Sequence, residues 1–95
     1  MAKFLKISNV LGQYIFWCQG CGCGHAVWVR PSTNPLNGGN WDFNGNTNKP
    51  TINPSILIND SENRICHSFI NDGNIQYLND CTHKLAGQTV ELIDI

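Results

Sequence analysis

Five cysteines and three histidines are the side chains of this sequence whose types and spacing could bind a metal ion. Cys18 and Cys21 form a Cys-x-x-Cys turn in which Gly20 lets the backbone and the sulfurs wrap around a cation. Zn²⁺ prefers four thiolate or imidazole ligands in a tetrahedron, so a second pair of ligands must come from elsewhere in the chain. An odd number of cysteines without an export signal argues against a disulfide scaffold. The sequence therefore predicts a structural zinc site.

The elements that must position these ligands are predicted to be strands. Helix signals are scarce, and the frequent asparagines favour turns and loops. We expect residues 1–95 to form one mainly β domain, a small antiparallel sheet or meander stabilised by the zinc site. In this interpretation Pro31–Pro50 is a loop whose aromatic residues lie on the core. The expected strands are Phe4–Val10, Gln13–Trp17, Ala26–Arg30, Ser55–Ile58, Arg64–Ile70, Ile75–Asn79 and Thr89–Ile93.

Asp72-Gly73 lies between two of these strands and predicts a two-residue hairpin turn, which would place Cys66 opposite Asn79. If the second strand continues, Cys81 shares a face with Cys66 as its diagonal neighbour. Together with Cys18 and Cys21, this pair predicts a four-cysteine zinc site. Cys23 is left over and is an alternative to Cys21. The histidines His25, His67 and His83 are alternatives to a cysteine ligand.

The opposite face of the same meander is predicted to carry a second group of residues. If the loop at 59–63 closes symmetrically, Ser55 lies opposite His67, and Asp80 flanks the imidazole on the other side. A nucleophile, a base and an orienting acid require this order. The structural alternatives are a turn hydroxyl for Ser55, a zinc ligand for His67 and a turn cap for Asp80. A slip of one residue in the register would separate the three side chains.

Several separated motifs, in order along almost the whole chain, resemble one protein family. They are Phe16-Trp17-Cys18-Gln19-Gly20-Cys21, Trp41-Asp42-Phe43-Asn44-Gly45-Asn46, Pro50-Thr51-Ile52-Asn53-Pro54-Ser55-Ile56, Cys66-His67-Ser68-Phe69-Ile70 and Asp80-Cys81-Thr82-His83-Lys84-Leu85-Ala86-Gly87-Gln88-Thr89-Val90. The chain resembles the domain-of-unknown-function family 6527, small proteins of phage and bacterial genomes, some of which carry the label ammonia monooxygenase. Oxygen chemistry at copper or iron would want histidine-rich or carboxylate sites, whereas this sequence offers a cysteine-rich one.

The resemblance also implies an activity. Relatives of this family occur beside bacterial ubiquitin-like conjugation genes, where they act as peptidases that process or remove the ubiquitin-like protein. Carried onto this sequence, a serine mechanism implies Ser55 as nucleophile and His67 as base, whereas Asp80 follows from the register alone. We therefore expect a zinc-stabilised peptidase or isopeptidase that acts on a protein or peptide, such as a ubiquitin-like protein.

Composition excludes other classes of partner. The net charge is −1 and the six basic residues are scattered, so no footprint for nucleic acid is present. No apolar run approaches the roughly 18–20 residues of a membrane span, and we expect a cytoplasmic protein of a bacterial cell or its phage.

Two other functions fit the sequence. One is a non-catalytic, zinc-ribbon-like module that binds a protein through Trp41–Ser55. The other is a catalytic zinc with three protein ligands, including His67 or His83, and a water.

Overall fold

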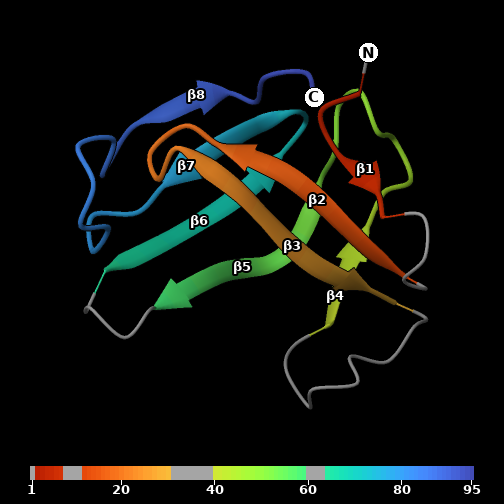
Figure 1. Ribbon diagram of the computed structural model, residues 1–95, viewed down its shortest axis with the longest axis horizontal. Helices are drawn as coiled ribbons and strands as arrows, with labels where there is room; N and C mark the ends of the chain where they lie inside the picture. The colour runs from red at the N-terminus through yellow and green to blue at the C-terminus, as the bar shows by residue number, and fades with distance from the viewer. Residues whose placement is uncertain (1, 8–11, 31–39, 60–63) are drawn as a thin grey trace.

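The computed structural model describes residues 2–7, 12–30, 40–59 and 64–95, which form an all-β structure (Figure 1). The strands are β1 (Leu5–Lys6), β2 (Gln13–Cys18), β3 (Cys23–Val29), β4 (Asn40–Phe43), β5 (Ile52–Asn59), β6 (Ile65–Asn71), β7 (Asn74–Tyr77) and β8 (Thr89–Glu91). They pair in sequence order from β1 to β8 in one sheet that curls into a half-barrel. Every pair is antiparallel except β3 and β4, so the predicted fold class is confirmed. The described residues contain no helix long and apolar enough to cross a membrane.

The curl of the sheet makes an inner face that is the core. The β2–β3 hairpin crosses over β5, β6 and β7 (Figure 1), and Phe16 and Val27 of this hairpin are buried with Ile56, Ile70 and Tyr77. Along β6 the side chains alternate between a buried inner set and a more exposed outer set. One strand therefore presents residues to two separate environments.

Some of the predicted strand boundaries are wrong. β4 lies inside the segment expected to be a loop, and it forms because Trp41 and Phe43 pack against the core. β3 begins at Cys23, three residues before the predicted start, because the β2–β3 ladder continues to the pair Cys18↔Cys23. The other half of the predicted loop, 31–39, lies outside the described residues, as do residues 8–10 of the first predicted strand and residues 60–63 of the loop before β6.

The β6–β7 hairpin has the predicted register. Asn71 pairs with Asn74, and Ser68 pairs with Tyr77. Asp72 and Gly73 both have positive φ, at 51° and 82°, as a type I′ turn requires. The twist of this turn matches that of the strands, which is why the Asp-Gly pair was sufficient to predict the hairpin.

The β5–β6 register differs from the prediction by two residues. Leu57, not Ser55, is the partner of His67. The shift occurs between Ile52 and Ile56, where residues 53–55 form a bulge opposite Phe69 and the Asn53–Pro54 peptide is cis. Because side chains alternate with a period of two, a shift of two residues leaves all the paired side chains of β5 on their predicted faces. Ser55 lies in the bulge.

Candidate active site and metal cluster

The outer face of β6 carries a chain of hydrogen bonds between three side chains. Ser55 Oγ lies 3.1 Å from His67 Nε2, and His67 Nδ1 lies 3.0 Å from Asp80 Oδ2. We assign the proton of the neutral imidazole to Nδ1, since Asp80 can only accept when ionised. Nδ1 then donates to the carboxylate and Nε2 accepts the hydrogen bond of the serine hydroxyl. This is the connectivity of a nucleophile, a general base and an orienting acid.

The β5 bulge and the segment after β7 position these three groups. The carbonyl oxygen of Ser55 accepts a hydrogen bond of 3.2 Å from Trp41 Nε1, which fixes the bulge to β4. The Sγ atom of Cys81 lies 3.2 Å from both the backbone N and the backbone O of His67. The structure thus brings the three predicted side chains together, although Ser55 reaches His67 from a bulge and not from the directly opposite position.

The three groups are partly exposed to solvent. The His67 side chain is 24% exposed and that of Asp80 is 52% exposed. The inner-face neighbour Cys66 is only 3% exposed. The outer group is therefore in contact with solvent, whereas the neighbouring inner residue is in the core.

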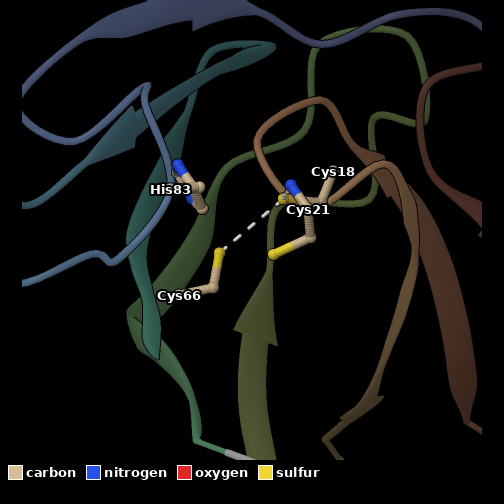
Figure 2. A group of neighbouring side chains, drawn as sticks. All are labelled: Cys18, Cys21, Cys66 and His83. Carbon is tan, nitrogen blue, oxygen red and sulfur yellow. Dashed lines mark hydrogen bonds between the residues drawn. The ribbon is translucent and has the colours of Figure 1, made fainter. Parts of the chain in front are cut away.

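The inner face carries a second cluster, in which the ligand atoms of four side chains lie within 4.8 Å of one another (Figure 2). Cys18 ends β2, Cys21 lies in the turn after it, Cys66 is on β6, and His83 lies between β7 and β8. The Sγ atoms of Cys18 and Cys66 are 3.6 Å apart. The backbone N–H of Cys21 donates to Cys18 Sγ over 3.3 Å, so the turn curves toward the cluster.

The fourth member of this cluster differs from the prediction, because His83 occupies the place expected for Cys81. β7 ends at Tyr77, and the chain then turns so that the Cys81 N–H donates to the Leu78 carbonyl over 3.2 Å. The alternation that would have put Cys81 beside Cys66 therefore no longer applies. The only signal for His83 in the sequence was its place two residues after a cysteine. His67, another alternative, lies on the other face of the sheet.

The residues of this cluster fit a metal ion. Three thiols and one imidazole make a Cys₃His set, which is one of the common structural zinc sites. The Nε2 atom of His83 is buried and has no hydrogen-bond partner among the described residues. A Cβ atom at Gly20 would collide with the His83 ring, so glycine leaves the space that the ring occupies. A cavity of about 410 Å³ borders Cys21, Cys66 and His83 and gives an ion access to the cluster.

The electrostatics of the cluster favour a cation. The hydrogen bond between Cys18 and Cys66 holds the pKa of Cys18 well below its usual range and raises the pKa of Cys66. Burial raises the pKa of Cys21 to about 11. The Tyr77 hydroxyl lies 3.3 Å from Cys18 Sγ and accepts the Gly20 N–H over 3.2 Å, a contact that the sequence did not predict. Burial disfavours the charged, thiolate form of the cysteines, and a bound divalent cation would stabilise that form.

Two short segments connect the two sites. Asp80 contacts His67 on the outer face, while His83 lies with Cys66 in the inner cluster. Between them, Thr82 Oγ1 accepts the Ile65 N–H over 2.9 Å, and the Thr82 N–H donates to the Ile65 carbonyl, also over 2.9 Å. We name residues 80–83 the strap. It runs along residues 65–67 and carries one member of each site.

Comparison with known proteins gives one family. A family model described as "Bacterial ubiquitination-like system serine protease (BubE)" matches residues 3–78. The assignment to domain-of-unknown-function family 6527 is wrong, because the matching model is that of BubE. The description confirms the predicted activity, a serine protease associated with a ubiquitin-like system. No curated protein and no solved structure matches the chain.

Proposed function

The chain belongs to the BubE family of bacterial ubiquitination-like system serine proteases, and on that premise we propose that Ser55, His67 and Asp80 are its catalytic residues. The observation that carries this proposal is the unbroken hydrogen-bonded chain from Ser55 Oγ through the imidazole to the carboxylate, with contacts of 3.1 and 3.0 Å. These three hydrogen-bonded side chains are partly exposed on the outer face, which further supports the proposal, since the substrate of such an enzyme is a protein.

The proposed mechanism uses each group once in each half of the reaction. Ser55 Oγ attacks the carbonyl carbon of the scissile bond while His67 Nε2 takes the hydroxyl proton. Asp80 keeps the proton on Nδ1 and stabilises the imidazolium that forms. The imidazolium then gives its proton to the leaving amine as the C–N bond breaks, which leaves an acyl-serine. A water, deprotonated by His67, hydrolyses this ester and regenerates Ser55.

We propose that the inner cluster holds a structural Zn²⁺ through Cys18, Cys21, Cys66 and His83. Four protein ligands complete a tetrahedron, and a zinc ion bound in this way supplies a cross-link and no open coordination position. The strap then ends at a fixed point, and the Asp80 carboxylate is held against His67. In this proposal the inner site stabilises the geometry that the outer site uses.

The proposed substrate is a ubiquitin-like protein. The enzyme would either cleave the peptide bond that follows its C-terminal segment or release it from the amine to which it is conjugated. The family description places the enzyme in a ubiquitination-like system, and a serine nucleophile can cleave both peptide and isopeptide bonds. An outer face that is open to a macromolecule supports a folded protein with an extended tail as the substrate.

A fluorophosphonate probe tests the nucleophile, because it reacts with activated serines. We expect the purified, metal-loaded protein to be labelled at Ser55, as located by mass spectrometry of the digested adduct. Ser55→Ala should abolish labelling while metal content and melting temperature stay as in the wild type. Ser68→Ala is not a matched control, because Ser68 is buried. Thr89→Ala, which removes an exposed hydroxyl on β8, is better suited.

The outcomes separate the proposed function from the alternatives. Labelling that persists in Ser55→Ala would refute the assignment of the nucleophile. A wild type that is never labelled and cleaves no ubiquitin-like fusion would favour the non-catalytic binding module. Cleavage that a chelator stops at once, with the fold intact, would favour a catalytic metal.

A further inference from the structure

Two large apolar side chains are exposed beside the proposed active site. Leu57 is 57% exposed and Phe69 is 40% exposed, on β5 and β6 respectively. Both are on the outer face, since their neighbours Ile56, Ser68 and Ile70 are buried. The other exposed large apolar residues among the described ones lie on other strands or near the C-terminus: Leu5, Trp17 and Ile93. Leu5 and Trp17 lie on the adjacent strands β1 and β2, whereas Leu57 and Phe69 form the exposed apolar pair on the same face as Ser55 and His67.

The register places these two side chains on opposite sides of the reacting pair. Leu57 is the direct cross-strand partner of His67, and Phe69 lies opposite the bulge that contains Ser55. Side chains in such positions have Cβ atoms roughly 4.5–5.5 Å apart in a regular pair. The hydrogen bond from Ser55 to His67 thus runs along one diagonal of a four-residue patch, and Leu57 and Phe69 occupy the ends of the other diagonal.

Resting on the proposed function, we infer that Leu57 and Phe69 form apolar substrate-binding subsites that flank the scissile bond. A carbonyl placed on Ser55 Oγ brings the residues on its two sides over these side chains. The ligand class is an extended polypeptide with an apolar side chain next to the cleaved bond. The occupant is the substrate chain, because the patch is continuous with the hydroxyl and imidazole that would react with it.

The experiment compares two fluorophosphonate probes on the metal-loaded protein, one with a long alkyl chain and one with an ethylene glycol chain of equal length. The readout is the ratio of their second-order rate constants for labelling Ser55. In the wild type we expect the alkyl probe to react about 5- to 10-fold faster, since partial burial of an apolar chain is worth on the order of 1 kcal/mol. Leu57→Asn and Phe69→Asn should each lower this ratio to below about 2.

Two further variants serve as controls. Phe69→Leu keeps an apolar side chain and should retain most of the preference for the alkyl probe. Leu5→Asn makes the same chemical change on β1, at the other end of the strand order, and should leave both rate constants unchanged. Metal content and melting temperature show that each variant is folded.

Each outcome decides the inference. A wild-type ratio near one, or a ratio unaffected by both asparagine variants, would overturn it while leaving the assignment of Ser55 intact. A wild type that sediments as a dimer and becomes a monomer in Leu57→Asn, with no change in the ratio, would show that the patch binds a second copy and would also overturn it. If neither probe labels Ser55, the proposed function fails and the subsites fail with it.

Discussion

The two faces of β6 show how one strand can serve two kinds of chemistry. Cys66 points inward to a cluster whose other members come from the end of β2, from the turn after it and from the strap, and Cys66 is almost fully buried. His67, the next residue, points outward to a serine and a carboxylate that a substrate can reach. The period of two in a strand separates the sites, while the strap joins them. The comparison teaches that damage to the inner site should reach the outer one, whereas the reverse should not occur.

Removal of the proposed zinc ion is expected to have the largest effect, because it should disrupt both the inner and the outer site. Structural zinc sites contribute binding free energy on the order of 10 kcal/mol, which is comparable to the whole stability of a small domain. Chelation, or Cys66→Ser, should therefore unfold most of the protein at 25 °C and abolish fluorophosphonate labelling. Circular dichroism, metal analysis and labelling measure these three effects. Cys23→Ser, an exposed thiol outside the cluster, is the matched control and should change none of them. Retention of the fold and of labelling without metal would contradict the proposed role of the inner site.

Asp80→Asn should break the outer face alone. An amide cannot hold the imidazole in the tautomer that leaves Nε2 free to accept the serine proton, and loss of this control in serine proteases lowers kcat by up to about 10⁴-fold. Asp80 is half exposed, so water replaces part of its effect, and we expect a loss of about 10²- to 10³-fold in kcat. Asp72→Asn makes the same change in the β6–β7 turn and should leave kcat as it is. Metal content should remain at the wild-type level. A loss of metal in Asp80→Asn would mean that damage to the outer site also affects the inner site.

The sequence predicted the faces better than the ends of the strands. Asp72-Gly73 specified the β6–β7 register, because a type I′ turn leaves little freedom in how the strands pair. The β5–β6 register could not be predicted, since residues 60–63 contain no comparable turn signal and nothing in Asn53-Pro54-Ser55 states how many residues a bulge absorbs. The error of two residues preserved the faces, so the outer group was predicted in spite of the wrong pairing.

The same limit explains the error at the inner site. Continuation of β7 to Cys81 was an assumption about where a strand ends, and strand ends depend on tertiary hydrogen bonds. Here the Tyr77 N–H and carbonyl pair with Gln88 and Gly87 of the returning chain, and the strap begins soon afterwards. His83 and Trp41 could be placed only once these long-range contacts were known.

A comparison of the strap residues His83 and Cys81 distinguishes a metal ligand from a residue that only holds the strap to β6. His83→Ala should lose the metal. Cys81→Ser should keep it, because Cys81 Sγ forms hydrogen bonds with the backbone of His67 and is not a member of the Cys₃His cluster. Cys81→Val, which removes these hydrogen bonds without leaving a large cavity, should cost about 1 kcal/mol of stability. Metal stoichiometry and denaturant unfolding measure the two quantities. If Cys81→Ser binds no metal, the result would support the predicted four-cysteine site and contradict the Cys₃His cluster.

Trp41→Phe should have the smallest effect, and it tests whether the bulge is held from β4. The phenyl ring keeps most of the packing against the core but cannot donate to the Ser55 carbonyl, so the variant loses one hydrogen bond of about 1 kcal/mol. If that bond positions Ser55 for attack, the maximal rate of labelling at saturating fluorophosphonate should fall about fivefold, while the half-saturating concentration changes little. A loss confined to stability would lower the melting temperature and leave the maximal rate intact. Trp28→Phe on β3 makes the same substitution away from the bulge, and an equal fall in its labelling rate would show that the Trp41 hydrogen bond has no specific role in positioning the nucleophile.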